Sequence, residues 1–334
     1  MKAVVVEKYD TIDKVALKDV AQPEITPGMV RVRIQAASIG FVDGLKVQGL
    51  YQTKDPLPLI PGTEFSGTVD ALAPDVEGFT PGTPVIGMAR SGGLAEYICL
   101  PASSLFVRPE GVTPEVGASF FANYLTALYS LGVRAKLCHG ETLLVLGAAG
   151  GVGIAAVQVA KLLGASVIAA ASTDAKRQFA KAYGADAVVD YTADGWRDEI
   201  RTLTNGRGVD VIFDPVGGDV SLQAFRSIAW NGRHLVIGFA SGRIPALPFN
   251  LPLLKGGALL GVDLAQIGHR EPDVRDQVIA QLFAWLHERT LIPVVGRIFA
   301  LQDFRDAFEA MTTRSALGKM VIRIAPSALH EEKL

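Results

Sequence analysis

The sequence has little cysteine and little net charge. Its 334 residues include two cysteines, Cys99 and Cys138, which are too few for a disulfide framework or a four-thiolate zinc site. The formal net charge is -2 at pH 7, so there is no electrostatic reason to expect a nucleic-acid partner. Acidic residues also come too early in the chain for a secretory signal. These observations predict a cytoplasmic protein that binds no nucleic acid.

One stretch, residues 143–160, is long and apolar enough to resemble a membrane span. It contains four glycines, which are Gly147, Gly150, Gly151 and Gly153. They would interrupt a uniform helix, but they suit a tight turn between a buried strand and a helix. We therefore predict no association with a membrane.

Motifs for metal ions and for nucleophilic catalysis are also missing. The chain has no His-Glu-x-x-His, no Cys-x-x-Cys and no Gly-x-Ser-x-Gly sequence, so zinc-peptidase, zinc-ribbon and α/β-hydrolase interpretations have no support. The histidines show no spacing typical of a metal site; they are His139, His234, His269, His287 and His330. We predict no bound metal and expect a cofactor to supply the chemistry, which favours hydride transfer.

The first hundred residues are organised as strands and turns. In residues 29–36 the apolar positions alternate with Arg31, Arg33 and Gln35, which is typical of a strand with one buried face. Frequent prolines and glycines then divide the chain into short pieces. This pattern predicts an irregular β domain over residues 1–122.

From Glu141 the pattern changes to alternating strands and helices. Strand, helix, strand, helix and strand cover residues 141–191, and further strands are expected at 209–213, 234–238 and 258–262. This alternation predicts a mostly parallel, doubly wound α/β sheet over residues 123–265. The remaining residues, 266–334, are too few for a domain. We expect them to pack on the first domain, which makes the second domain an insertion.

The most informative motif is Gly147-Ala-Ala-Gly-Gly-Val-Gly153. A strand precedes it and a helix follows it, so its backbone N–H groups lie at a helix N-terminus and can bind a diphosphate. Gly150 and Gly153 allow the diphosphate and the neighbouring strand to approach without a Cβ in the way. A flexible turn is the alternative, but the surrounding strand, helix and second strand favour a dinucleotide site.

The end of the next strand indicates which dinucleotide binds. An NAD site places Asp or Glu there, against the ribose hydroxyls, whereas this chain has Ala171 followed by Ser172 and Thr173. Lys176 and Arg177 follow in the first turn of the next helix, where a cation opposes the helix dipole. Hydroxyls and cations suit a 2′-phosphate. We therefore predict NADPH, with the alternative that Lys176 is a solvated surface lysine.

Several further motifs are specific in combination. They are Gly40-Phe-Val-Asp43 with Gly49-Leu-Tyr51, Pro61-Gly-Thr-Glu-Phe-Ser-Gly67, Gly92-Gly-Leu-Ala-Glu-Tyr97, Gly147 to Gly153 with Ala155-Ala-Val-Gln158, Asp214-Pro-Val-Gly-Gly218 and Gly318-Lys-Met-Val-Ile322. Over essentially its whole length the chain resembles the medium-chain dehydrogenase/reductase superfamily, and within it the zinc-independent quinone oxidoreductases of the zeta-crystallin type. The resemblance implies a Rossmann domain inserted into a GroES-like, mainly β catalytic domain.

The resemblance also implies an activity, the NADPH-dependent reduction of quinones or α,β-unsaturated carbonyl compounds by hydride transfer without zinc. The zinc branch of the superfamily carries a ligand cysteine where this chain has Gly40, and Gly-His-Glu where it has Gly62-Thr63-Glu64. Loss of that Lewis acid matters because zinc stabilises the alkoxide in alcohol oxidation. A quinone or enone needs less help, since the phenolate or enolate that forms is delocalised.

The resemblance assigns roles to individual residues. Those expected at the cofactor are Gly150, Gly151, Val152 and Gly153 along the diphosphate, Ser172, Lys176 and Tyr191 near the 2′-phosphate, Phe239 and Ala240 on the nicotinamide side, and Lys319 pointing into the cleft. Those expected in the substrate pocket are Gly40, Phe41, Asn123 and Thr126. Tyr51 is a candidate catalytic residue that orients a carbonyl or relays a proton, or else a tyrosine of the pocket wall. Bacterial relatives carry Asn at the position of Gly40, so the acceptor stays open.

Two other functions stay open at this point. The enoyl-reductase domains of polyketide synthases share the glycine turn and the zinc-free architecture, so an enoyl-thioester reductase is one alternative. A nucleotide-binding protein without turnover is the other, because lens proteins and RNA-binding members are found in the family. The resemblance further implies a homodimer that pairs the edge strands of two cofactor domains near residues 258–262.

Overall fold

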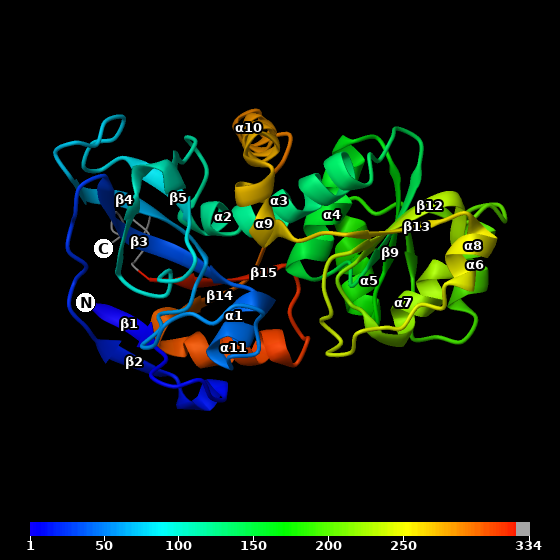
Figure 1. Cartoon of the computed structure of the whole chain (residues 1–334), viewed down its shortest axis with the longest axis horizontal. Helices are drawn as coiled ribbons and strands as arrows, with labels where there is room; N and C mark the ends of the chain where they lie inside the picture. Colours follow the sequence, from blue (N-terminus) through cyan, green and yellow to red (C-terminus); the bar gives the residue numbers. More distant parts are fainter. Residues whose placement is uncertain (325–334) are drawn as a thin grey trace. The chain divides into compact units, whose positions relative to one another are not determined.

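The computed structural model describes residues 1–324, which form two compact units (Figure 1). The first unit consists of Met1–Ala122 together with the chain from Pro293 onward. The second unit consists of Asn123–Ile292. Along the chain, the second unit therefore interrupts the first.

The first unit is built on a mainly antiparallel sheet, which has seven strands within the described residues. Six follow the order β14-β15-β3-β4-β5-β7, and β6 pairs with β3. The strands are β3 (Met29–Ile39), β4 (Glu64–Leu72), β5 (Pro84–Met88), β6 (Tyr97–Pro101), β7 (Leu105–Val107), β14 (Val295–Ala300) and β15 (Lys319–Arg323). Val30, Val32 and Ile34 alternate along β3 and are fully buried, so one face of this strand lies in the hydrophobic core.

Shorter elements complete the first unit. A separate antiparallel pair is formed by β1 (Lys2–Val5) and β2 (Ala16–Asp19). The helices are α1 (Phe41–Val47), α2 (Pro114–Ala118) and α11 (Phe304–Thr312). Phe304 and Phe308 of α11 are buried in the same core as β3 and β4, which is how the chain after residue 293 becomes part of this unit.

The second unit is a parallel sheet in the order β10-β9-β8-β11-β12-β13. The strands are β8 (Thr142–Leu146), β9 (Ser166–Ala170), β10 (Ala187–Val189), β11 (Val209–Asp214), β12 (Ile228–Val236) and β13 (Ala258–Gly261). The order reverses between β8 and β11, where Leu143 pairs with Val211. In doubly wound sheets, ligands bind outside the carboxyl ends of the strands at this reversal.

Helices precede β8, follow β13 and connect the strands between them. They are α3 (Phe121–Leu128) with a π-helical turn (Tyr129–Arg134), α4 (Gly151–Leu162), α5 (Asp174–Ala182), α6 (Trp196–Leu203), α7 (Gly218–Phe225), α8 (Asn250–Lys255), α9 (Leu264–Arg270) and α10 (Pro272–His287). Helices α4 to α8 each connect two consecutive strands of this sheet. Leu144, Ile168 and Ile212 of the central strands pack with Phe225 and Ile228 in the core. The predicted parallel α/β sheet is therefore observed.

Two predicted boundaries differ from the structure. The fifth strand runs over Ile228–Val236 and not over residues 234–238. Its partner β11 ends at Asp214, whose carbonyl oxygen accepts the N–H groups of both Ile237 at 2.9 Å and Gly238 at 3.3 Å, so no further residue of β11 is left to pair with. Residues 266–292 belong to the second unit and not to the C-terminal segment. One reason is that Tyr129 donates a hydrogen bond to Glu271 at 2.9 Å. Residues 325–334 of the predicted segment lie outside the described residues.

The apolar stretch from residue 143 to 160 forms β8, the glycine turn and most of α4. Within residues 1–324, no helix combines the length and the apolar character that crossing a bilayer requires. Cys99 and Cys138 are both free thiols.

Candidate functional site

The glycine turn lies at the carboxyl end of β8 and leads into α4. Gly147 has a φ of +61°, a left-handed conformation that favours glycine. Position 153 requires glycine for a different reason, because a Cβ there would lie 2.8 Å from Ala148 Cα. The first turn of α4 therefore packs directly on the backbone that leads into it, and this contact fixes the direction of the helix N-terminus.

Within the described part of the chain, position 150 has no such need for glycine. Gly150 is the N-cap of α4, its φ is -75°, and a Cβ would meet nothing closer than Gly147 O at 3.5 Å. The open space lies beside the N–H groups of Gly151, Val152 and Gly153, which have no acceptor within the helix. The turn is therefore a cradle that a Cβ would fill, and its residues fit a diphosphate.

A second turn meets the first at the neighbouring strand. β11 ends at Asp214, whose Oδ1 accepts the N–H groups of Val216 at 2.8 Å and Gly217 at 3.0 Å. A Cβ on Gly147 would lie 3.0 Å from Val216 Cγ2. The structure thus brings the two turns into contact where the strand order reverses, which is the expected ligand position in this type of sheet.

Asp214 is a buried charge that holds the second turn. Its Oδ2 lies 3.0 Å from His234 Nε2 and accepts the hydroxyl of Ser221. Burial opposes ionisation, but the hydrogen bonds from His234, Ser221 and the backbone outweigh it and lower the pKa of the Asp214 carboxyl. The charged carboxylate therefore keeps the turn in one shape. The Asp-Pro-Val-Gly-Gly motif contributes to the family resemblance, but the sequence predicted no role for Asp214 itself.

The chain that follows β12 lies on the second turn. The N–H of Ala240 donates to Pro215 O at 3.0 Å. Phe239 contacts Gly217, where a Cβ would lie 2.9 Å from the aromatic ring. Phe239 and Ala240, which are predicted on the nicotinamide side, therefore lie at the same end of the sheet as the glycine turn.

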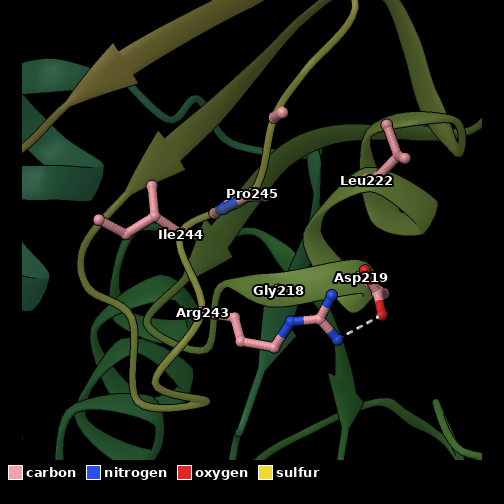
Figure 2. A pocket seen from close by; sticks show the side chains of 7 residues that line it. Gly218, Asp219, Leu222, Arg243, Ile244 and Pro245 are labelled. Carbon is pink, nitrogen blue, oxygen red and sulfur yellow. Dashed lines mark hydrogen bonds and ion pairs between the residues drawn. The ribbon is translucent and has the colours of Figure 1, made fainter.

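A cavity of about 290 Å³ lies beside this turn (Figure 2). It is lined by Gly218, Asp219, Leu222, Arg243, Ile244, Pro245 and Ala246. At its edge Arg243 pairs with Asp219 at 2.9 Å, and both side chains are exposed. Because the two charges neutralise each other, the cavity offers little net charge to an ionic ligand.

Ser172 and Thr173 follow the buried Ala171 at the end of β9, the strand next to β8. Thr173 is the N-cap of α5, and its hydroxyl accepts the N–H of Lys176 at 3.4 Å. Lys176 is partly exposed in the first turn of that helix. The structure therefore places Ser172 and Lys176 beside the strand end at which the sequence argument expects the ribose.

Arg177 and Tyr191 have contacts within the second unit. Arg177 pairs with Asp190 at 2.8 Å and donates to Ala171 O at 3.2 Å. Hydrogen bonds from Thr192 and the charge of Arg177 lower the pKa of Asp190. Tyr191 is partly buried against the core. Arg177 thus ties the ends of β9 and β10 together.

The first unit contains a buried cluster of charges at one end of its strands β15, β3 and β4. Glu64, at the start of β4, accepts the ammonium of Lys319 and the hydroxyl of Ser38 at Oε1, and the N–H of Ala122 at Oε2. The strand register places Ser38 opposite Glu64 and Lys319 at the start of the strand beside β3. Lys319, which is predicted to reach the cofactor cleft, is thus bound to Glu64, and its role toward a cofactor stays a prediction.

Asp43 adds a second buried carboxyl group to this cluster. Its oxygens accept the N–H groups of Gly40 at 2.7 Å and Gly62 at 3.1 Å. Burial raises the pKa of Asp43, although these hydrogen bonds and the Lys319 ammonium act in the opposite direction. A Cβ on Gly40 would lie 3.3 Å from Lys319 Nζ. The glycine therefore leaves room for the ammonium, a relation between residues far apart in the chain that no sequence pattern indicated.

The donor atoms of this cluster are already used. Gly40 offers no side-chain ligand, Glu64 is bound to Lys319, and both oxygens of Asp43 accept backbone N–H groups. Across residues 1–324, no group of three or more His, Cys, Asp or Glu side chains is arranged to hold a metal ion. These residues therefore do not fit a divalent cation.

The other predicted pocket residues lie on both units. Phe41 is the first residue of α1 and is exposed, and Tyr51 is half-buried on the segment after α1. Asn123 and Thr126 lie on α3 and are partly exposed. Because Gly40, Phe41 and Tyr51 belong to the first unit and the other two belong to the second, their assembly into one pocket stays a prediction.

Comparison with known proteins gives a match in each of the two units. The model of the alcohol dehydrogenase GroES-like domain matches residues 26–110, and that of zinc-binding dehydrogenases matches residues 151–284. The chain is 36% identical over 309 residues to quinone oxidoreductase-like protein 2 of Bos taurus, which covers 92% of this chain and 88% of that protein.

Two further similarities extend over nearly the whole chain. A phenolphthiocerol/phthiocerol polyketide synthase of Mycobacterium tuberculosis is 30% identical over 319 residues, which cover 96% of this chain and 14% of that protein. The quinone oxidoreductase of Thermus thermophilus, whose structure is also known in complex with NADPH, has a TM-score of 0.84 and 33% identity, covering 97% of this chain and 100% of that chain.

The comparisons confirm the fold class predicted from the sequence, a Rossmann-type parallel sheet combined with a GroES-like domain. With its glycine turn at the strand reversal and these relatives, the chain belongs to the medium-chain dehydrogenase/reductase superfamily of oxidoreductases, among its quinone oxidoreductase-like enzymes.

Proposed function

We propose that this enzyme reduces quinones or α,β-unsaturated carbonyl compounds with NADPH, by hydride transfer and without zinc. The observation that carries the proposal is the open cradle at Gly150, since no contact within residues 1–324 requires glycine there. The relative from Thermus thermophilus, which binds NADPH and is a quinone oxidoreductase, supports the same conclusion. The cytoplasm stays the predicted compartment.

The preference for NADPH rests on the end of β9. A carboxylate at this position would bind the ribose hydroxyls of NAD and repel a 2′-phosphate. The chain has Ala171 there, with Ser172 next to it and Lys176 in the first turn of α5. A hydroxyl and a cation can both donate to a phosphate, so these two side chains would hold the 2′-phosphate.

The absence of zinc from the proposed mechanism rests on the donor set of the first unit. Lys319 already supplies a buried positive charge to Glu64, so a divalent cation would have to displace the ammonium. A quinone or enone does not need that cation, because the negative charge that develops after hydride transfer is delocalised over the acceptor.

The residues of this chain bind and orient the reactants. When bound, NADPH supplies the hydride. The N–H groups of Gly151 and Val152 would hold the diphosphate, and Phe239 would line the nicotinamide side and exclude water. The phenol of Tyr51 would orient the acceptor carbonyl through a hydrogen bond.

A screen of electron acceptors tests the proposed activity. Purified enzyme should oxidise NADPH with quinones or enones, as followed by absorbance, and a chelator should leave the rate unchanged. Faster turnover of enoyl thioesters than of quinones and enones would favour the enoyl-thioester reductase, in line with the polyketide synthase similarity. Tight NADPH binding without oxidation on any acceptor would favour a nucleotide-binding protein without turnover.

The 2′-phosphate site is tested by Lys176→Ala. Loss of a charge-assisted hydrogen bond costs about 1.5–3 kcal/mol, so affinity for NADPH should fall about ten- to hundredfold while affinity for NADH stays unchanged. Calorimetry with both coenzymes measures the difference. An equal loss for NADPH and NADH would remove Lys176 from the phosphate site.

The diphosphate cradle is tested by comparing Gly150→Ala with Gly153→Ala. The first variant should keep its thermal stability but bind NADPH about tenfold more weakly or worse, because the new methyl group occupies the ligand's space. The second should lose about 1–3 kcal/mol of unfolding free energy, because its Cβ meets the turn itself. Unchanged NADPH affinity in Gly150→Ala would contradict the cradle.

We also propose that the enzyme is a homodimer formed through β13. This edge strand lies near several exposed apolar side chains of the second unit, which are Trp230, Phe249, Leu253, Leu254 and Leu259. Exposed edges and large apolar surfaces are typical of protein interfaces. Sedimentation should give twice the mass of one chain, and Leu259→Asp should give the monomer. Leu203→Asp, at an exposed leucine of α6, is the control, and a wild-type monomer would overturn the proposal.

A further inference from the structure

The segment that follows α1 has almost no regular structure, yet one of its residues is a buried charge. Residues 48–63 contain neither a helix nor a strand, and they carry Tyr51. Asp55 of this segment is buried among two cations. Its Oδ1 accepts Arg90 Nε, and its Oδ2 lies 3.0 Å from Lys46 Nζ. The ion pair therefore helps to hold the first part of this segment, whereas its later part is held by backbone pairing such as that of Leu59 with Val6.

Lys46 is the central member of this group. It lies on α1, and its side chain is 6% exposed. Its ammonium donates to Arg90 O, contacts the Asp55 carboxylate and lies 5.9 Å from the centre of the Tyr51 ring. One buried cation thus links α1 to the loop after β5 and to the segment that carries Tyr51.

The second carboxylate oxygen of Asp55 has this cation as its partner. Among residues 1–324, Asp55 Oδ2 makes no hydrogen bond, so the Lys46 charge is its partner. Burial opposes the ionisation of Asp55, but the hydrogen bond from Arg90 and the charges of Arg90 and Lys46 outweigh it and lower the pKa of the carboxyl. Loss of the ammonium would leave a buried carboxylate with one bound oxygen, which is costly.

Backbone contacts fix the segment on both sides of Tyr51. Tyr9 donates its hydroxyl to Asp55 O, and Arg90 donates to Lys54 O at 3.3 Å. Before Tyr51, Gly49 lies against the Tyr9 ring, since a Cβ there would come within 2.9 Å of it. With both sides held, the remaining freedom of Tyr51 lies in its side chain, which faces the Lys46 ammonium.

We propose that Lys46, held between Asp55 and Arg90, is a positioning residue that orients the Tyr51 ring and so sets how tightly the enzyme binds its carbonyl acceptor. The role rests on the proposed reduction of quinones or enones. Lysine suits it because a single ammonium serves both as the counter-ion of the carboxylate and as a cation on the face of the aromatic ring. Arginine retains both properties, whereas methionine retains the length and loses the charge.

The test compares Lys46→Met, Lys46→Arg and Tyr51→Phe in steady-state kinetics. In Lys46→Met the KM for the acceptor should rise about three- to thirtyfold, the range of a cation–π contact, with the KM for NADPH unchanged. Lys46→Arg should recover most of this loss. In the Tyr51→Phe background, Lys46→Met should raise the acceptor KM no further. Lys54→Met is the matched control, since Lys54 lies over the Tyr9 ring at 5.8 Å and does not contact the Asp55 carboxylate, and it should behave as wild type.

Two results would overturn the proposal. The first is a Lys46→Met effect that multiplies with that of Tyr51→Phe, because Lys46 would then not act through the phenol. The second is an equal rise in the KM for NADPH and for the acceptor, which indicates a general loss of structure.

If the wild-type enzyme reduces no acceptor, the proposed function fails, and the positioning of Tyr51 is then judged by amide hydrogen exchange. Exchange across residues 51–55 should be faster in Lys46→Met and unchanged in Lys54→Met. Equal exchange in the two variants would overturn the positioning role as well.

Discussion

The shape of the glycine turn depends on how closely backbone can approach backbone at the carboxyl ends of β8 and β11. The first turn of α4 packs on the turn before it because Gly153 has no side chain, and Gly147 lies against Val216 of the neighbouring turn. These contacts use up the space around two of the glycines. The space at Gly150 stays open at the end of a helix whose first N–H groups have no acceptor within it, and an anion is the ligand that such a position favours.

The first unit is organised around charged side chains instead of glycine contacts, since it buries cations next to carboxylates. Lys319 lies against Glu64 with room left by Gly40, and Lys46 lies against Asp55. A buried ion pair gains little net stability over apolar packing, but the loss of one partner is costly. We infer that the two pairs in this unit serve to specify geometry more than to add stability. In this unit they fix the start of β15 and the segment that carries Tyr51.

Much of the second unit could be predicted from its sequence, because its signals are local. The glycine turn, Ala171 at the end of β9 and the alternation of apolar strands with helices each lie within a few consecutive residues. The prediction was less accurate for residues 266–292, whose place depends on contacts such as that of Tyr129 with Glu271. It was also incomplete for Asp214, because its partner His234 lies on another strand. A helix or strand pattern contains no information about partners at that distance.

The sequence by itself determined the fold class, the position of the glycine turn and the absence of an acid at the end of β9, since each follows from residue types that lie next to one another in the chain. Only the tertiary structure decided which charges share a site. Glu64 with Lys319, and Asp55 with Lys46 and Arg90, meet because antiparallel strands and irregular loops bring distant residues together. Burial then makes the ionisation of Asp55 depend on the charges of Lys46 and Arg90, and that dependence exists only after the chain has folded.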